Sequence, residues 1–565
     1  MIAVALVAAA IASVWVWRVF TADGPASVTR AEASASYYPE DAVAYAWMTL
    51  EPGEGPFGSL LPMLGQLDEL EGVPGLTGGG EDMLPDGIGA VLGEVGTWLG
   101  TEVSAGVVDL DDQGVGVAIT VGVRDSDAAA EFLHNWLHHQ KTGASTPFER
   151  HVVGDGVIWV GGGNEWMEEQ AYAQAGDLLL FATDRGLLEE MLDRVDGDHR
   201  ETLASAERFE EARAAARDGR FASAYVDLEW LAGKMGDPDH TSCPGALFDR
   251  PEWLMVSADW VGDGLVVDMA TPDMTSWWTD SSAGVTDAVV PAEALGFVSM
   301  GFDPDIDRWR EVMGGCEIAD LIPGGYMFEP PSEMDGSFEP GATLADALDL
   351  ALRFVDLGTG LDLEADLFDH LGGQLVIAAH SPGGEASSFE GVAALSYRPL
   401  SANALEGTMG GIAGGVSTLT GVSLRQVDLG ASRPANLMEG GKPLSLGYVL
   451  HDGFLTFGTS PGALETTLAV REGTRDSVSD TDRYRRVGDH IPYDPLLLAY
   501  VDLAQVIGLM GSSGMGPDDG LFAMLSGWLG PMALGVGTDG DYSRATLVVS
   551  FSPSMDAFMD GAGGS

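Results

Sequence analysis

Alternating apolar and polar residues predict a long β-hairpin in each half of the chain. The two segments are SAGVVDLDDQGVGVAITVGV at residues 104–123 and QLVIAAHSPGGEASSFEGVAALSY at residues 374–397, each with a polar, glycine-containing loop. After the first hairpin, SDAAAEFLHNWLHHQ at residues 126–140 opens on a Ser/Asp cap and has apolar residues at helical spacing. Hairpins followed by helices favour an α+β fold, a mostly antiparallel sheet covered by helices.

Three blocks of sequence recur in the same order in the two halves, which predicts an internal duplication. AVAYAWMTLEP at residues 42–52 aligns without gaps to ALGFVSMGFDP at 294–304, and LLLFATDRGLLEEML at 178–192 to FLTFGTSPGALETTL at 454–468. AYVDL is identical at residues 224–228 and 499–503. The unit predicted from the first half is strand, helices, hairpin, helix, strand pair, helix, strand, helix, strand pair.

With 565 residues, the chain exceeds what one hydrophobic core usually supports. We therefore predict two diverged copies of a sheet-plus-helices unit, preceded by one N-terminal transmembrane helix. The predicted boundaries are residues 1–20 for the membrane anchor, 21–36 for a flexible linker, 37–284 for the first unit, 285–555 for the second unit and 556–565 for a flexible tail.

The first 17 residues, MIAVALVAAAIASVWVW, are uncharged and almost wholly apolar. This length favours a spanning helix over the shorter apolar region of a cleaved signal peptide. An A-x-A cleavage motif occurs at Ala33-Ser34-Ala35, but it lies too far beyond the apolar segment for a signal-peptide cleavage site. Arg18 and Arg30, both on the C-terminal side, argue for a cytoplasmic body. The layout of anchor, linker and large acidic body is instead typical of export, and we expect the body on the extracytoplasmic side.

The composition is strongly acidic, with 87 Asp and Glu against 27 Lys and Arg and a formal net charge of -60. Such a surface repels polyanions, so we expect no nucleic-acid partner. The charge indicates either a salty habitat or a GC-rich genome under ordinary selection for solubility.

Two cysteines, Cys243 and Cys316, both lie next to glycine or proline. An even count in an oxidising compartment allows one disulfide between them. Two unrelated thiols remain the alternative.

At the level of families, the chain resembles domain-of-unknown-function family 3352, an uncharacterised family of bacterial envelope proteins. The resemblance rests on the P-x-x-A-x-x-Y/F strand opening, the strand-turn-helix at residues 178–192 and the AYVDL strand, and it spans roughly residues 36–553. It implies an N-terminally anchored or exported protein and brings no catalytic residues.

The predicted helix at residues 126–140 carries the best candidate for a metal site. Glu131, His134 and His138 are spaced by three and four residues and share one helical face, as metal ligation requires. The corresponding segment of the second half, ANALEGTMGGI, has no histidine, so a solvated polar face is the alternative.

Other motifs for catalysis are weak. The G-x-S-x-G sequence at Gly458–Gly462 has the strand-to-helix context of a nucleophile elbow, but Pro461 lacks the backbone N–H that an oxyanion hole needs there. The G-x-G-x-x-G sequence at residues 535–540 precedes a strand-like segment and predicts a hairpin turn. Acidic runs such as Asp303, Asp305 and Asp307 lack the glutamate of a calcium-binding loop and fit turns and helix caps.

These observations predict a membrane-anchored, extracytoplasmic protein without catalytic residues or a cofactor, which binds an envelope protein or an apolar ligand. The alternative is a metal-dependent hydrolase of the cell envelope that uses Glu131, His134 and His138. An open hydrophobic cavity would support ligand binding, and convergence of the three side chains in a cleft would support the hydrolase.

The salt hypothesis makes a direct prediction about thermal stability. The distance over which charges repel one another falls from about 10 Å at 0.1 M salt to about 3 Å at 1 M. We therefore expect the melting temperature to rise with NaCl up to and beyond about 1 M, as followed by circular dichroism. A midpoint that stays flat over this range would rule out a dependence on salt.

Overall fold

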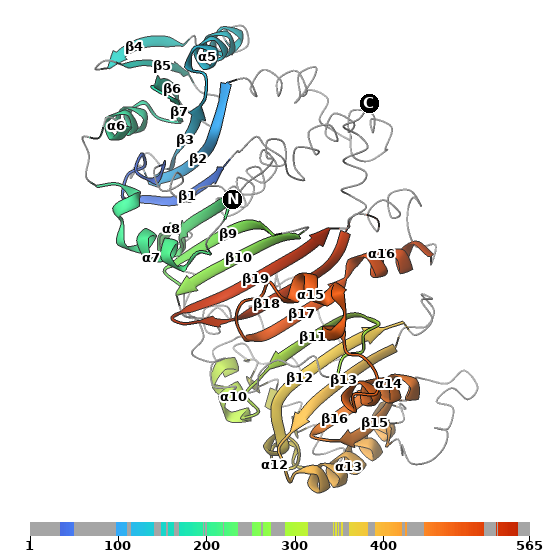
Figure 1. The fold of residues 1–565 in the computed structure, drawn as a ribbon. Coiled ribbons are helices and arrows are strands. Elements are labelled where there is room, and N and C mark those ends of the chain that lie inside the picture. Colours follow the sequence, from blue (N-terminus) through green and yellow to red (C-terminus); the bar gives the residue numbers. More distant parts are fainter. Residues whose placement is uncertain are drawn as a thin grey trace, which may run out of the picture.

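The computed structural model has an α+β fold dominated by one large, mostly antiparallel sheet (Figure 1). It describes residues 34–49, 98–109, 115–140, 148–153, 156–162, 169–195, 197, 201–217, 220–234, 251–261, 264–272, 289–314, 343, 345–346, 348–349, 352–353, 361–381, 390–420, 424–426, 446–512, 527 and 529–551. The predicted α+β class is thereby confirmed.

The first half of the chain supplies ten of the strands. Their hydrogen-bonded order is β4-β5-β6-β7-β3-β2-β1-β8-β9-β10, and every neighbouring pair is antiparallel. They are β1 (Ala42–Thr49), β2 (Leu99–Asp109), β3 (Val115–Val123), β4 (Glu149–Val153), β5 (Gly156–Gly162), β6 (Glu169–Ala175), β7 (Leu178–Ala182), β8 (Ala222–Asp227), β9 (Trp253–Val261) and β10 (Gly264–Pro272). The predicted hairpin at residues 104–123 is β2–β3.

The second half supplies the other nine strands in the order β14-β15-β16-β13-β12-β11-β17-β18-β19. Only β14–β15 is parallel among the described strand pairs. They are β11 (Ala294–Gly301), β12 (Leu371–His380), β13 (Glu390–Tyr397), β14 (Leu424–Gln426), β15 (Leu446–His451), β16 (Phe454–Gly458), β17 (Pro495–Asp502), β18 (Leu529–Asp539) and β19 (Tyr542–Phe551). The order β12-β11-β17-β18-β19 matches β2-β1-β8-β9-β10 strand for strand.

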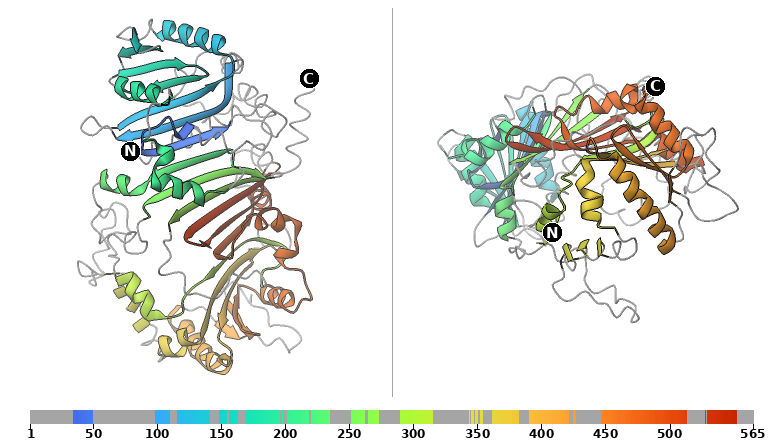
Figure 2. Two further views of the ribbon diagram at one scale, coloured as in Figure 1. Left: turned by 60° about the vertical axis from the view of Figure 1, so that its left-hand side comes forward. Right: turned by 90° about the horizontal axis from the view of Figure 1, so that it is seen from below.

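Helices lie on both faces of this curved sheet (Figure 2). The described helices are α5 (Ser126–Gln140), α6 (Arg185–Val195), α7 (Glu207–Ala215), α8 (Leu228–Lys234), α10 (Ile306–Gly314), α12 (Leu363–Asp366), α13 (Ala402–Thr420), α14 (Pro461–Arg471), α15 (Asp482–Gly488) and α16 (Leu503–Ser512), with short 3-10 turns η3 (Leu203–Ser205), η5 (Phe368–His370) and η6 (Val478–Asp480). Between α5 and α6 the sequence pattern predicted one strand pair, whereas the structure has four strands, β4 to β7.

The repeated AYVDL segment forms a strand and starts a helix in both halves. In the first half, the carboxylate of Asp227 accepts a hydrogen bond of 2.8 Å from the backbone N–H of Trp230. In the second half, Asp502 accepts one of 3.0 Å from the N–H of Gln505. Aspartate at the N-terminus of a helix satisfies a backbone donor that the helix leaves free. This explains why the strand ends at the aspartate in each half.

A matching set of aromatic rings forms the core beneath each of these strands. In the first half, the ring centroid of Phe209 lies 5.6 Å from that of Tyr45 and 5.3 Å from that of Tyr225. The second half has Phe297, Tyr484 and Tyr500 with separations of 5.5 to 6.0 Å. Large buried rings of this kind dominate core energetics.

An arginine next to each helical ring reaches the aspartate of the strand. Arg208 donates to Asp227 at 3.1 Å, and Arg483 donates to Asp502 at 3.0 Å. Each pair links a helix, α7 or α15, to the strand that the helix covers. Equivalent arginine–aspartate pairs therefore fix the position of the helix in both halves.

The two halves are joined by antiparallel pairing of β10 with β19, from Gly264 opposite Ser550 to Pro272 opposite Tyr542. Asp268 of β10 is only 2% exposed and accepts hydrogen bonds of 2.6 Å from Arg544 and Thr546 of β19. Arg544 also donates to the carbonyl of Ala215 in α7 at 2.7 Å. A buried charged group is tolerated only when it is paired in this way.

Tyr493 extends this polar cluster from the second half. Its hydroxyl donates to the carbonyl of Gly535 at 2.8 Å and lies 3.2 Å from the hydroxyl of Thr546. Burial raises the pKa of Tyr493 to about 12, so the hydroxyl keeps its proton near neutral pH.

None of the helices in the described part of the chain is long and apolar enough to cross a membrane. The predicted anchor at residues 1–20, nearly all of the linker at 21–36 and the tail at 556–565 lie outside the described residues. Cys243 and Cys316 lie outside them as well, so the disulfide stays a prediction.

The buried ion pair between β10 and β19 predicts a large effect of substitution. Asp268→Ala leaves the guanidinium of Arg544 buried without its main partner, which should lower the free energy of unfolding by roughly 3–5 kcal/mol. Replacing both residues with leucine should cost less than the single change, because no charge is then left unpaired. Urea unfolding measures both values.

Asp482→Ala is the control for this experiment. It breaks the pair with Arg485 in α15, in which the aspartate and arginine side chains are 91% and 51% exposed, and should cost less than about 1 kcal/mol. Similar losses for Asp268→Ala and Asp482→Ala would show that the buried pair has no special role in joining the halves.

Candidate functional site

The central strands have two distinct faces because side chains alternate along a strand. One face carries Tyr45 and Tyr225, which lie opposite each other on β1 and β8 and contact α7. The other face carries Ala46, which lies opposite Ala105 of β2 and Ala224 of β8. We call the first the aromatic face and the second the pocket face.

The first pocket lies on the pocket face of β2, β1, β8, β9 and β10 and has a volume of about 160 Å³. Its floor consists of small side chains, which leave space above the sheet. Larger apolar side chains surround them, and the full lining is Ala46, Trp47, Met48, Val103, Ser104, Ala105, Phe221, Ala222, Ser223, Ala224, Val256, Ala258, Leu265 and Val267. This volume is close to that of engineered apolar cavities that hold a benzene molecule.

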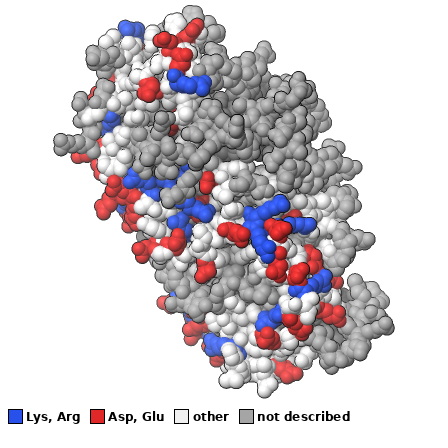
Figure 3. Space-filling view, viewed as in Figure 1, with Lys and Arg blue, Asp and Glu red and all other residues white. Residues whose placement is uncertain are grey.

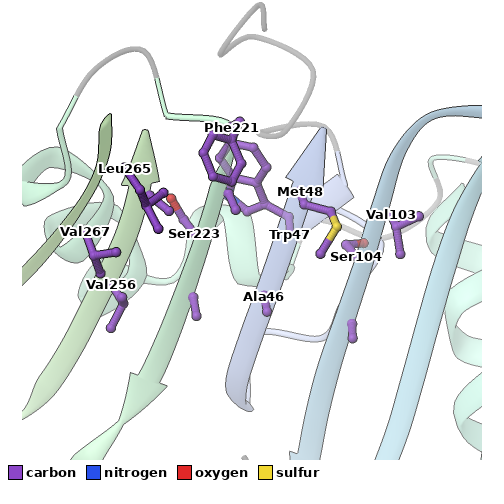
Figure 4. Close-up of a pocket in the computed structure, with 14 residues that line it drawn as sticks. Ala46, Trp47, Met48, Val103, Ser104, Phe221, Ser223, Val256, Leu265 and Val267 are labelled. Carbon is purple, nitrogen blue, oxygen red and sulfur yellow. The ribbon is translucent and has the colours of Figure 1, made fainter. Parts of the chain in front are cut away.

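Figure 4 shows how the lining is arranged across the strands. Met48 and Phe221 lie near one end of the pocket, where they pack together with Val103. Val256 and Val267 lie toward the opposite side, on β9 and β10. The pocket is thus a short apolar trough across five strands.

The second pocket lies on the same face of the second half, over β12, β11, β17, β18 and β19. Its volume is about 490 Å³, within the range of typical ligand pockets. Its lining is Leu295, Gly296, Phe297, Val298, Ile377, Ala378, Ala379, Ala499, Tyr500, Val501, Val506, Met532, Leu534 and Leu547. Val298 and Ile377 are 39% and 51% exposed, which is unusual for large apolar side chains in the middle of a sheet.

The two pockets occupy equivalent places in the two halves. Alignment of residues 42–52 with 294–304 matches Ala46 to Val298, and the AYVDL repeat matches Ala224 to Ala499. Val298 lies opposite Ala499 in the sheet, as Ala46 lies opposite Ala224. Each pocket is therefore built on the same five strands of its half.

Comparison with known proteins assigns the chain to a family. Residues 93–396 match the family described as "Protein of unknown function (DUF3352)", which is more than half of the chain. The chain belongs to this family. This confirms the resemblance seen in the sequence and assigns no activity.

The other comparisons add little to the DUF3352 assignment. No curated protein matches the chain. Two solved structures of TP0453, crystal forms I and III, are 8% and 7% identical, with TM-scores of 0.24 and 0.25. They cover 45% and 43% of this chain, and the match spans 82% and 80% of those chains. At such TM-scores the likeness supports no inference about fold or function.

The three predicted metal ligands lie on helix α5 of this DUF3352 protein, and the side chains of two of them are described. Glu131 and His134 are both exposed, and the side chain of His138 lies outside the described residues. No three His, Cys, Asp or Glu side chains are placed to hold a metal within the described part of the chain. The metal site therefore stays a prediction, and the two described side chains lie at the surface of the helix.

The G-x-S-x-G serine has a structural role at the start of α14. The hydroxyl of Ser460 accepts a hydrogen bond of 2.9 Å from the backbone N–H of Ala463, and Pro461 occupies the first turn of the helix. In the first half, Asp184 caps α6 in the same way through the N–H of Leu187. The serine and the aspartate at matching turns are both helix caps.

Other motifs in the sequence are also explained by local structure. Asp303 and Asp305 accept hydrogen bonds from backbone N–H groups two residues further on, as Asx turns do. The G-x-G-x-x-G segment is the β18–β19 hairpin, in which Gly540 adopts a φ of +64°, a value that favours glycine. The predicted hairpin turn is confirmed.

Basic side chains lie among carboxylates on the face shown in Figure 3. Single arginines contact several acidic groups at once: Arg310 pairs with Asp307, Asp349 and Glu364. Such networks partly offset the excess of acidic residues. Neither apolar pocket has a charged side chain among its described lining residues.

The sequence predicts an apolar ligand but does not show which strands form a pocket for it. The sequence of β1, AVAYAWMT, does indicate such a place, because it is almost wholly apolar on both faces of the strand. A strand that is apolar on both faces needs an apolar environment on each. The described helices over the first pocket's strands supply that environment on the aromatic face.

Proposed function

We propose that this chain is a non-catalytic, membrane-anchored protein of the cell envelope that binds neutral lipids on its pocket face. The observation that carries the proposal is the pair of apolar pockets at equivalent positions in the two halves. Binding of an apolar ligand requires an open apolar cavity. A sheet with a purely structural role requires none.

The linings favour acyl or other hydrocarbon chains. Alanines form the floor of the first pocket, and Val298, Ile377 and Leu534 line the second. A hydrocarbon chain placed there gains about 0.8 kcal/mol for each methylene removed from water. The broader second pocket accommodates a longer or branched segment than the first.

The charge of the protein selects against anionic lipids. A carboxylate or phosphate group at the mouth of either pocket would meet no arginine or lysine in the described lining, and the chain carries a formal charge of -60. Like charges disfavour such a complex. A lipid with an uncharged head group avoids this cost.

The proposed duplication explains why there are two pockets. Corresponding strands pair in the same order, and Arg208–Asp227 corresponds to Arg483–Asp502. Two diverged copies of one unit would each inherit the trough on the pocket face. Their linings have diverged, as the exchange of Ala46 for Val298 at equivalent positions shows.

The apolar N-terminal segment supports the proposed location. Residues 1–17 are uncharged and long enough to approach the width of a bilayer, and a polar stretch separates them from the folded body. An anchor would hold the two pockets near a membrane, the source of apolar ligands. The layout favours a body outside the cytoplasm.

The ligand proposal predicts that filling the pockets weakens binding. Ala224→Leu and Ala499→Leu place three extra carbons in the first and second pockets. Displacing two methylenes of a bound chain should cost roughly 1.6 kcal/mol, about a tenfold loss of affinity for each pocket. Titration calorimetry with a neutral monoacylglycerol below its critical micelle concentration measures this loss.

Ala404→Leu on the exposed surface of α13 is the matched control and should leave the affinity unchanged. A fatty acid of the same chain length should bind more weakly than the monoacylglycerol. Melting curves must show that each variant is folded. Equal affinities for the wild type and both pocket variants would contradict the proposal, and tighter binding of the fatty acid would contradict its selectivity for neutral lipids.

The proposed location predicts the behaviour of the chain in fractionated cells. The full chain should be in the membrane fraction and resist extraction by high salt, and deletion of residues 1–20 should release it. Protease added to intact spheroplasts should digest the body while a cytoplasmic marker survives. Protection of the body until the cells are lysed would show that it lies in the cytoplasm.

A further inference from the structure

A third pocket lies between α5 and the strands β4, β5 and β6, apart from the two apolar pockets. Its volume is about 510 Å³, and its lining mixes polar and apolar side chains. The lining residues are Ala130, Leu133, His134, Arg150, Val157, Trp159, Gln174 and Gly176. The strands that form its floor have no role in the apolar pockets.

The sheet register brings the functional side chains of this pocket together. Arg150 of β4 lies directly opposite Trp159 of β5, and Trp159 lies opposite Tyr172 of β6. Residues opposite each other in antiparallel strands share one face. Leu133 of α5 packs against this face, next to Trp159 and Tyr172, which places the following residue, His134, at the rim.

Arg150 is an exposed arginine in the lining of the third pocket. Arg208, Arg310 and Arg544 each contact two or more carboxylates. Arg150 forms no ion pair within the described part of the chain, although the sequence has more than three acidic residues for each basic one. The carboxylate nearest in sequence, Glu149, lies on the opposite face of β4 together with His151, at 3.9 Å from its ring.

The remaining side chains define the shape of a ligand. Trp159 is half-buried and offers part of its ring to the pocket. Gln174 donates its side-chain N–H to the carbonyl of Ser126 at 2.9 Å, which orients the amide. Among the described residues, its oxygen stays available to accept a hydrogen bond. His134 adds a second polar group at the rim.

We propose that this third pocket binds a carboxylated sugar. The guanidinium of Arg150 matches the two oxygens of a carboxylate, and the indole of Trp159 packs against the apolar face of a sugar ring. Gln174 and His134 bind hydroxyl groups. A simple anion would use the arginine alone, and a neutral sugar would leave the arginine without a partner.

Titration calorimetry with glucuronate tests this site. The full chain, in salt high enough that its melting temperature no longer rises, should bind glucuronate at least tenfold more tightly than glucose or acetate. Arg150→Gln should weaken binding of glucuronate at least tenfold, and Arg150→Lys should weaken it less. Binding should also change the tryptophan fluorescence, and the change should disappear in Trp159→Phe.

Arg398→Gln is the matched control, because it removes the same charge from an exposed position in the second half and should leave the affinity unchanged. Equal affinity for glucuronate and acetate would show a simple anion site and overturn the proposal. Failure of glucuronate to bind, or equal loss of binding in the Arg150 and Arg398 variants, would overturn it as well. Melting curves for each variant distinguish loss of the site from loss of the fold.

Discussion

The antiparallel pairing of β10 with β19 is the contact on which the rest of the structure depends. It joins the halves into one continuous sheet and places Asp268 between Arg544 and Thr546 of the partner strand. Because Arg544 also contacts α7, the same arginine links the second half to a helix of the first. Loss of this pairing would separate the strands under the two apolar pockets, since β10 contributes to one and β19 to the other.

Much of the fold within each half is predictable from the sequence, because it depends on local patterns. Alternation gave the β2–β3 and β12–β13 hairpins, and helical spacing gave α5. The pairing of β10 with β19 has no such signal, because Asp268 and Arg544 are 276 residues apart. Four strands, β4 to β7, lie where the sequence pattern predicted one pair, because each of them is short, with five to seven residues.

The candidate sites show the same division between local and distant information. The roles of Ser460 and Asp184 as helix caps follow from their position at the start of a helix. The apolar pockets depend on five strands that are far apart in the chain, so a single segment such as β1 only hints at them. The third pocket depends on the register that sets Arg150 against Trp159, which no spacing within the sequence reveals. His134, one of the predicted metal ligands, lies at the rim of that pocket.

The pairing of β10 with β19 has a further consequence for aggregation. Each is the last strand of its half, and each would be an unpaired edge of nine or more residues if that half stood alone. Long free edges readily pair with other chains. In the joined sheet the two edges cover one another, and the described strands at the ends of the sheet are β4, with five residues, and β14, with three. The pairing thus hides two long edges inside the sheet and, among the described strands, leaves short ones at its ends.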